Sequence, residues 1–441
     1  MSTGFGWVSV ARLGLVQACL GAIVVMTTST LNRVMVVELA LPALLPGLLV
    51  AMHYLVQVLR PRMGYGSDMG RRRTPWIVGG MAVLAVGGAL AALATAWMGS
   101  DRVAGIALAV FAFTLIGVGV SASGTSLLVL LASRVDAPRR AGAATLVWLM
   151  MIVGFAVTAG VAGKLLDPYS PARLVEVTAA VSAVAMAVTL LATWRLEGAA
   201  GSALSAVPST ERKPSFREAL AQVWAEPVAR RFTIFVFISM LAYSAQDLIL
   251  EPFAGSVFGF TPGESTSLSG IQHGGVLLGM LAAALAGRGR RFGSLRAWQI
   301  GGCLMSALML LGLVAAAFVG SAWPFTATVF ALGVSNGAFS IAAIASMMRL
   351  ASEGRHAREG VRMGRWGAAQ AVAFGMGGLV GTGASDLARW LIGTPAMAYA
   401  AVFALEAALF VVAAVLAARL TSGRVAAART ETRPPTNGVT A

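Results

Sequence analysis

The stretch RPRMGYGSDMGRRRTPW, residues 60–76, decides the fold; it carries five arginines and one aspartate. It lies between two apolar runs that are each long enough to cross a lipid bilayer. Basic loops between membrane spans stay on the cytoplasmic side. The stretch therefore predicts a membrane protein whose second and third spans are joined in the cytoplasm.

The residue spacing of this loop is similar to that of a loop in known transporters. Its glycines, aspartate and consecutive arginines are Gly64, Asp68, Gly70, Arg71, Arg72 and Arg73. They resemble the loop between spans two and three of major facilitator transporters, which reads G-x-x-x-D-R-x-G-R-R-R. The present loop is one residue shorter between Asp68 and Gly70, and Met69 stands where a basic residue is usual. The resemblance implies the major facilitator fold and carries no indication of transport chemistry.

The composition agrees with a membrane protein. Of the 441 residues 58% are hydrophobic and 12% are charged, with a mean hydropathy of +0.80, so lipid must solvate much of the surface. The formal net charge of +15 sits in short clusters between apolar runs, as membrane topology requires, and we expect no nucleic-acid partner. Cys19 and Cys303 lie inside apolar runs in opposite halves, where we expect packing roles rather than a disulfide. The apolar run after Arg12 is too long for a signal peptide and should remain as the first span.

A helix needs about 20 mostly apolar residues to cross a bilayer. Twelve stretches meet this need: 13–37, 41–59, 75–98, 103–133, 141–165, 172–194, 231–250, 266–287, 297–319, 323–349, 366–391 and 397–418. Together with a basic, Gly-rich loop after span eight, similar to the loop after span two, they predict two parallel repeats. The expected fold class is an all-α membrane protein with twelve transmembrane helices in two six-helix repeats.

The distribution of basic residues predicts the orientation of these spans. With the twelve spans above, 28 Lys and Arg lie on the side of both termini, and five lie on the other. Both termini are therefore expected in the cytoplasm. Seven tryptophans fall at predicted span ends, where indole rings are enriched: Trp76, Trp97, Trp194, Trp298, Trp323, Trp366 and Trp390.

A linker rich in Gly, Ser, Pro and charge, EGAAGSALSAVPSTERKPS, separates spans six and seven. The predicted units are a six-helix bundle in 1–194, a cytoplasmic linker in 195–230, a second bundle in 231–419 and a disordered cytoplasmic tail in 420–441. Within the linker, four apolar residues share one helical face: Phe216, Leu220, Val223 and Trp224. They predict a short helix on the membrane surface, either an exposed connector or a docking site.

Motifs of soluble enzymes are missing from the sequence. It contains no G-x-S-x-G, H-E-x-x-H or P-loop, no zinc-spaced Cys or His residues and no aspartate-rich magnesium motif. We therefore expect no catalytic residues, and no metal site of the chain's own.

Two polar clusters at matching places in the two repeats are candidate site residues. Asn32, Arg33 and Glu38 end span one, and Gln246, Asp247 and Glu251 end span seven. A base on one half facing acids on the other would close a central cavity as a charge-assisted clamp. The alternative is that each group reaches the membrane interface and is solvated there.

Other spans carry weaker signals. Span four has small residues but no Arg, which counts against the proton-driven export of related antiporters. Gly377 and Gly381 in span eleven have the spacing that lets helices pack closely, and they are also candidates for a flat wall against a planar ligand. Glu406, midway along span twelve, is either a hydrogen-bonded structural acid or a proton carrier.

Four longer strings resemble one family. They are TLNRVMVVELALPALLPG (30–47), RPRMGYGSDMGRRRTPWI (60–77), AQDLILEPFAGSVFG (245–259) and GRWGAAQAVAFGMGGLVGTGASDLAR (364–389). They are similar to the PucC family, the bacteriochlorophyll delivery branch of the major facilitator superfamily, and the loop is most similar to the type encoded beside bacteriochlorophyll synthase genes. The resemblance implies a protein of the bacterial inner membrane that assists the assembly of light-harvesting antennae. Its implied partners are bacteriochlorophyll or a precursor as cargo, light-harvesting apoproteins and bacteriochlorophyll synthase.

Two histidines are candidate ligands for the magnesium of such a pigment. His53 and His273 lie in spans two and eight, at similar depths in the two repeats. A neutral imidazole in lipid can supply the one axial ligand that a chlorophyll magnesium needs. The alternative is that each imidazole donates its N–H to a backbone or Ser oxygen.

Three functions follow from these observations. The first is a carrier that binds bacteriochlorophyll and delivers it to antenna proteins. The second is a secondary transporter of an amphipathic small molecule, and the third is a ligand-free accessory subunit of bacteriochlorophyll synthase.

Overall fold

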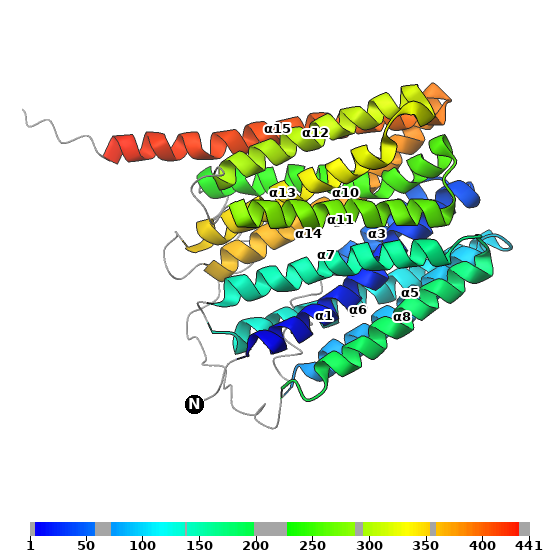
Figure 1. The fold of residues 1–441 in the computed structure, drawn as a ribbon, viewed down its shortest axis with the longest axis horizontal. Helices are drawn as coiled ribbons and strands as arrows, with labels where there is room; N and C mark the ends of the chain where they lie inside the picture. Colours follow the sequence, from blue (N-terminus) through cyan, green and yellow to red (C-terminus); the bar gives the residue numbers. More distant parts are fainter. Residues whose placement is uncertain are drawn as a thin grey trace, which may run out of the picture.

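The computed structural model describes residues 5–57, 72–136, 139–197, 227–286, 294–352 and 359–431. All regular structure in these ranges is helical, and the helices form one bundle (Figure 1). We call residues 5–197 the N-terminal half and residues 227–431 the C-terminal half. The end of the bundle where α1 begins and α15 ends is the proximal end, and the opposite end is the distal end.

Helices of the N-terminal half follow the predicted spans. The first span is α1 (Trp7–Val25), continued by the π-helical turn η1 (Met26–Thr30), α2 (Leu31–Arg33) and the π-helical turn η2 (Val34–Glu38). The others are α3 (Leu44–Val56), α5 (Thr74–Trp97), α6 (Arg102–Arg134), α7 (Arg140–Leu165) and α8 (Pro171–Thr193). Asp101 and Ser170 begin two of them by accepting hydrogen bonds from the backbone N–H groups of Ala104 and Arg173.

Helices of the C-terminal half come in the same order. They are α10 (Pro227–Phe258), α11 (Pro262–Ala286), α12 (Leu295–Val319), α13 (Phe325–Ser352), α14 (Glu359–Ile392) and α15 (Pro395–Glu431), with the short turn η5 (Gly320–Ala322) after α12. Gly320 and Gly393, with φ of 70° and 80°, end α12 and α14 in a conformation that favours glycine.

Ten helices of the described residues are long and apolar enough to cross a membrane. They occupy ten of the predicted spans, so the prediction of an all-α, multi-pass membrane protein is confirmed. The places of the other two are held by α3, which is described over 13 residues, and by α14, which is long but rich in glycine. The count of twelve stays a prediction.

Helix packing repeats between the halves. In the N-terminal half α1 contacts α7 and α8, α3 contacts α6, and α5 contacts α6 and α8. In the C-terminal half α10 contacts α14 and α15, α11 contacts α13, and α12 contacts α13 and α15. The helices described in one half thus correspond in order to those described in the other. Each half also has its own hydrophobic core, around Phe113 in the first and around Phe253 in the second.

The predicted tail, residues 420–441, and the predicted linker, residues 195–230, have different outcomes. Helix α15 continues to Glu431, so residues 420–431 are helical where the sequence led us to expect disorder. The run from Val425 to Ala428 consists of Val and the strong helix former Ala, and no proline interrupts the helix before Pro434. Most of the predicted linker 195–230, including the predicted surface helix, lies outside the described residues. The domain boundaries therefore stay predictions.

A candidate site between the two halves

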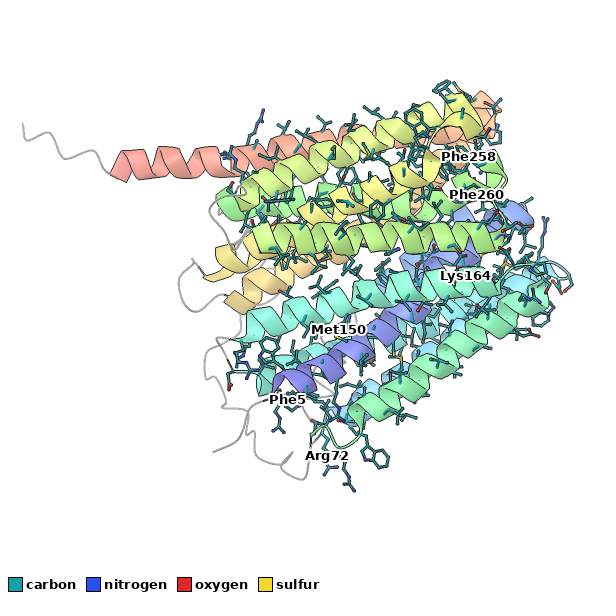
Figure 2. All side chains as sticks on the ribbon, viewed as in Figure 1. Phe5, Arg72, Met150, Lys164, Phe258 and Phe260 are labelled. Atoms are coloured by element: carbon teal, nitrogen blue, oxygen red, sulfur yellow. The ribbon has the colours of Figure 1, made fainter. Side chains whose placement is uncertain are left out.

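Polar side chains join the halves at the distal end. Figure 2 labels Lys164, Phe258 and Phe260 near this end, and Phe5 and Arg72 towards the proximal end. Pro252 lies inside α10 and has no backbone N–H, so the carbonyl oxygen of Leu248, four residues earlier, lacks its helical donor. The Asn32 side-chain amide donates to this oxygen from the N-terminal half at 2.5 Å. A proline in one half is thereby compensated by an amide of the other.

Hydroxyl groups extend these contacts. Ser29 donates a hydrogen bond to the Glu251 carboxylate, and its Oγ lies 3.2 Å from that of Ser269 in α11. Thr30 and Thr266 are hydrogen-bonded across the halves at 3.0 Å. We call Ser29, Thr30, Asn32 and Arg33, with their partners in the C-terminal half, the distal latch. The π-helical turn η1 ends at Thr30, and such turns are frequent at functional sites.

Arg33 does not form the ion pair that we expected. Its side chain is 2% exposed, pairs with Glu38 of its own half and donates to the Phe260 carbonyl oxygen of the other half. Among the described residues, Arg33 forms its ion pair with Glu38 and forms none with Asp247 or Glu251. The predicted pairing is therefore wrong. The reason is local, because the π-helical turn η2 places residues five apart above one another. Nearby, burial and then the charge of Glu38 raise the pKa of Tyr169, while Arg33 lowers it.

Gln246 and Asp247 face partners in their own half. The Asn336 amide donates to Gln246 Oε1 at 3.1 Å, and Ser306 donates to Asn336 at 2.8 Å. Gln272 of α11 donates to Asp247 at 3.4 Å. Of the predicted cluster, the structure thus brings Asn32, Arg33 and Glu251 to the boundary between the halves. Glu406 is buried in α15, and neither of its carboxylate oxygens has a hydrogen-bond partner among the described residues.

Below the latch, α7 and α11 form what we call the tight seam. A Cβ added at Gly270 would lie 2.8 Å from the Gly160 nitrogen, and one added at Gly163 would lie 2.6 Å from the Gly263 oxygen. Real Cβ atoms do not approach backbone this closely, so these glycines let the two backbones touch.

Helices α3 and α14 form the second contact, which we call the aromatic seam. The Tyr54 ring of α3 lies 5.6 Å from the Phe374 ring of α14, and Phe374 lies 5.9 Å from Tyr243 of α10. Here a Cβ at Gly375 would meet Tyr54 Cβ at 3.4 Å, an ordinary contact. The three rings were not among the predicted site residues. The one signal in the sequence is that Tyr243 and Phe374 are aromatic residues away from the ends of their spans.

The two predicted histidines lie on α3 and α11, one helix from each seam. The Gln57 amide nitrogen lies 2.9 Å from His53 Nε2 in α3. In α11, His273 Nδ1 lies 2.8 Å from the Ser269 carbonyl oxygen, and its ring packs edge-on against Phe155 of α7 at 5.0 Å. Both imidazoles are buried. His273 has the backbone-oxygen partner of the alternative to magnesium ligation, whereas the partner at His53 Nε2 is the Gln57 amide, and magnesium ligation stays a prediction.

Gly377 and Gly381 serve helix packing. A Cβ at Gly377 would lie 2.5 Å from the Leu241 oxygen, and one at Gly381 would lie 2.9 Å from the Ala245 oxygen. Both glycines therefore press α14 against α10, and a planar ligand cannot use them as a wall while this contact is made.

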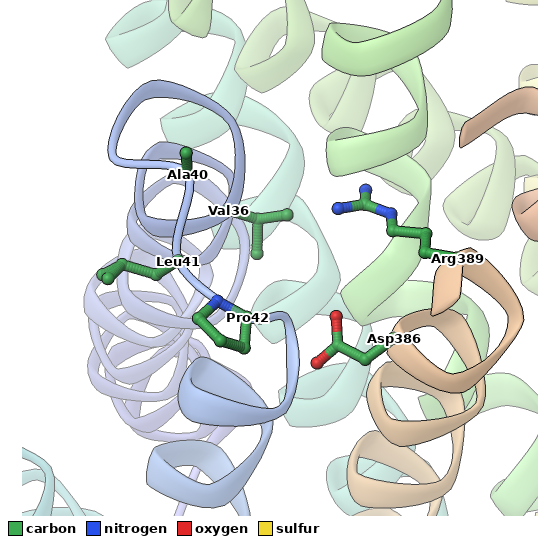
Figure 3. Close-up of a pocket in the computed structure, with 6 residues that line it drawn as sticks. All are labelled: Val36, Ala40, Leu41, Pro42, Asp386 and Arg389. Carbon is green, nitrogen blue, oxygen red and sulfur yellow. The ribbon is translucent and has the colours of Figure 1, made fainter. Parts of the chain in front are cut away.

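The distal end of the aromatic seam is hollowed. A pocket of about 400 Å³ lies between the turn before α3 and the end of α14, and its lining residues are Val36, Ala40, Leu41, Pro42, Asp386 and Arg389 (Figure 3). The Asp386 carboxylate accepts hydrogen bonds from the backbone N–H groups of Ala43 and Leu44, at 3.0 and 2.7 Å. Arg389 donates to the Tyr399 hydroxyl. The pocket's charged groups thus already have partners in the chain.

The basic loop is described only at its end. Gly64, Asp68, Gly70 and Arg71 lie outside the described residues, while Arg72 is exposed. Arg73 donates to Ser133 Oγ at 2.7 Å, and the backbone N–H groups of Arg73 and Thr74 donate to the Glu197 carboxylate. Glu197 therefore caps α5 and ties the end of the loop to the end of the N-terminal half.

This packing is that of a known class of membrane protein. The crystal structure of a peptide transporter, POT, superposes with a TM-score of 0.70 over 94% of this chain and 94% of the transporter, at 12% sequence identity. The protein is a multi-pass helical membrane protein with the fold of the major facilitator transporters.

Sequence comparison assigns the protein to one family within this class. A family profile described as "PUCC protein" matches residues 30–425, and the chain belongs to this family. It is 53% identical over 422 residues to a Rhodobacter capsulatus protein named "Bacteriochlorophyll synthase 44.5 kDa chain", covering 96% of this chain and 97% of the relative. It is 30% identical to "Protein PucC" of Cereibacter sphaeroides, covering 90% of this chain and 88% of that protein.

Proposed function

We propose that the protein is an assembly factor that binds bacteriochlorophyll and delivers it for the building of light-harvesting complexes. The observation that carries this proposal is the 53% identity, over nearly the full length, to a relative named as a chain of bacteriochlorophyll synthase. The match to the PucC family profile supports the same context. Light-harvesting apoproteins would receive the pigment, and bacteriochlorophyll synthase is the candidate donor.

We further propose that the chain carries pigment rather than catalysing its synthesis. Two six-helix halves that meet along seams provide a carrier with a ligand position at the midplane, as in transporters. The sequence has none of the enzyme motifs considered above. A catalytic partner would then supply the chemistry that the relative's name implies.

The proposed location is the bacterial inner membrane, with both termini in the cytoplasm. The excess of Lys and Arg on the side of both termini supports this orientation, because basic loops are retained in the cytoplasm. Cys19 and Cys303 are buried and should give little background labelling, so a single Ser67→Cys variant reports on the basic loop. It should react with an impermeant maleimide only after the cells are opened. Labelling in intact spheroplasts would contradict the orientation.

The decisive experiment is the absorption spectrum of the protein purified in a mild detergent from a phototrophic host. A bound pigment that absorbs in the near infrared, at a fixed ratio to protein, is expected. A pigment-free protein that drives flux of an amphipathic solute in proteoliposomes would instead support a secondary transporter. A pigment-free protein that copurifies with the synthase would support an accessory subunit.

A further inference from the structure

Three aromatic rings from three helices meet near mid-depth in the bundle. Tyr54 of α3, Phe374 of α14 and Tyr243 of α10 form a chain of contacts with ring centroids 5.6 and 5.9 Å apart. Tyr243 lies halfway along α10 and Phe374 near the middle of α14. Tyr54 belongs to the N-terminal half and the other two belong to the C-terminal half. The rings therefore sit at the boundary between the halves, at the depth where transporters of this fold bind their ligands.

These rings are not sealed into a core. All three are half-buried, whereas aromatic residues of the C-terminal core such as Phe253 and Phe403 are fully buried. The Tyr54 and Phe374 rings are tilted by 43°, and the Phe374 and Tyr243 rings meet edge-on at 61°. Partly exposed rings in the interior of a bundle leave apolar area that a ligand can cover.

A polar group lies one helical turn from these rings. Asp247 follows Tyr243 by four residues on α10 and so shares its face; it is half-buried, like the rings. Its one hydrogen bond among the described residues comes from Gln272 and is long, at 3.4 Å. A carboxyl group this weakly held, within a membrane span, points to a further polar partner. Aromatic faces with one or two placed polar groups are the usual composition of a site for a flat organic ligand.

We infer that Tyr54, Phe374, Tyr243 and Asp247 form a binding site for a planar conjugated macrocycle with oxygen substituents at its edge. The rings pack against the faces of the macrocycle, and Asp247 and Gln272 bind the edge groups. This inference rests on the proposed function, because it assigns the bacteriochlorophyll to one seam of the molecule. It also explains why side chains rather than backbones make the contact between α3 and α14, since side chains can rotate to admit a ligand.

The tight seam is the less suitable position. Its glycines bring the backbones of α7 and α11 together, so a macrocycle can enter only by separating two helices. In the aromatic seam the nearest groups to Gly375 and Gly383 are the Tyr54 and Leu44 side chains, at 3.4 and 3.6 Å. Moving side chains costs less than moving helices, so the ligand is expected on the α3, α14 and α10 side.

The test is a fluorescence titration of the detergent-solubilised full chain with bacteriochlorophyll a as the probe. Tyr54→Ala and Phe374→Ala, made singly, should each weaken binding about tenfold, as expected for loss of one aromatic contact with its buried area. Tyr54→Phe keeps the ring and should bind like the wild type. The matched control is Phe318→Ala, which removes a ring that is 61% exposed on the outside of α12 and should change nothing.

A spectroscopic readout tests Asp247 separately. Asp247→Leu should shift the vibrational band of a macrocycle carbonyl in the resonance Raman spectrum, whereas the Phe318→Ala spectrum should match the wild type. If Tyr54→Ala or Phe374→Ala is not monodisperse, the corresponding Leu variant replaces it, because Leu also removes the ring. If Asp247→Leu is not monodisperse, Asp247→Asn replaces it.

The outcomes distinguish failure of the aromatic binding site from failure of the proposed function. If the wild type binds no bacteriochlorophyll, the proposed function and the site both fail. If all variants bind it as the wild type does, the protein is a pigment carrier but the aromatic site is wrong. If Phe155→Ala, in the tight seam, lowers binding while Tyr54→Ala does not, the pigment lies at the other seam and the inference is overturned.

Discussion

The tight seam and the aromatic seam occupy corresponding positions in the two repeats but are built differently. The order of helices makes α11 the counterpart of α3, and α7 the counterpart of α14. Across the tight seam an added Cβ meets backbone atoms, and across the aromatic seam it meets side chains such as those of Tyr54 and Leu44. Because backbone contacts cannot be rearranged without moving a helix, the tight seam holds the halves together. The aromatic seam is left free to adapt to a ligand.

The halves are also joined more extensively at the distal end of the tight seam than at the distal end of the aromatic seam. Beside the tight seam, the hydroxyl groups of Ser29 and Thr30 continue the contact into α10 and α11. The aromatic seam ends in an open pocket, where the Asp386 carboxylate accepts hydrogen bonds from the backbone N–H groups of Ala43 and Leu44. The two halves are thus in continuous contact along the tight seam, whereas along the aromatic seam they contact each other at separate places. If the halves move relative to each other, we expect the tight seam to act as the fixed side.

The largest expected effect comes from adding one methyl group to each seam. Gly270→Ala places a Cβ against the backbone of α7 and should lower stability by about 1–3 kcal/mol, the usual cost of overpacking. Gly375→Ala makes ordinary contacts with Tyr54 Cβ and the Ala51 oxygen, at 3.4 and 3.9 Å, and should be neutral or slightly stabilising, because Ala is the better helix former. Thermal unfolding in detergent, followed by tryptophan fluorescence, measures both. Equal losses in the two variants would show that the seams do not differ in this way.

The distal latch gives an effect of similar size. Asn32→Ala leaves the Leu248 carbonyl oxygen buried without a donor and should cost about 1–3 kcal/mol. Pro252→Ala restores the backbone N–H that this oxygen lacks within α10. The double variant should therefore recover most of the stability lost in Asn32→Ala. If Asn32→Ala costs the same with Pro252 and with Ala at position 252, the amide does not compensate the proline.

A smaller effect tests the ion pair between Arg33 of the latch and Glu38 of the same half. Glu38 is 34% exposed, so the coupling free energy between Arg33→Ala and Glu38→Ala should be about 0.5–1 kcal/mol. The coupling between Arg33→Ala and Asp247→Ala should be near zero, because these residues do not pair. Double-mutant cycles on the unfolding midpoint provide both values. A coupling with Asp247 larger than that with Glu38 would restore the clamp across the halves that the sequence first indicated.

How far the sequence predicts this molecule depends on how local each feature is. Span positions follow from runs of apolar residues, and they are right for spans such as α5 and α6. Of the polar residues at the ends of spans one and seven, Asn32, Arg33 and Glu251 contact the other half, whereas Gln246 and Asp247 bond within their own half. Their pairing is not predictable, because it depends on a π-helical turn that turns Glu38 towards Arg33. Tyr54, Tyr243 and Phe374 are far apart in the chain, and only the packing of three helices brings them together.

The histidines give the smallest expected effect and compare the two seams directly. His53 lies on α3 of the aromatic seam with Gln57 at its Nε2, and His273 lies in the tight seam with Nδ1 against the Ser269 carbonyl oxygen. A magnesium ligand needs a free nitrogen that faces the macrocycle; His53 Nε2 already accepts from Gln57, and the His273 ring lies against Phe155. The double variant His53→Leu/His273→Leu should therefore copurify with wild-type amounts of pigment and support normal antenna yield. Loss of pigment in His273→Leu alone would move the pigment to the tight seam, and loss in His53→Leu alone would keep it at the aromatic seam with an imidazole on its magnesium.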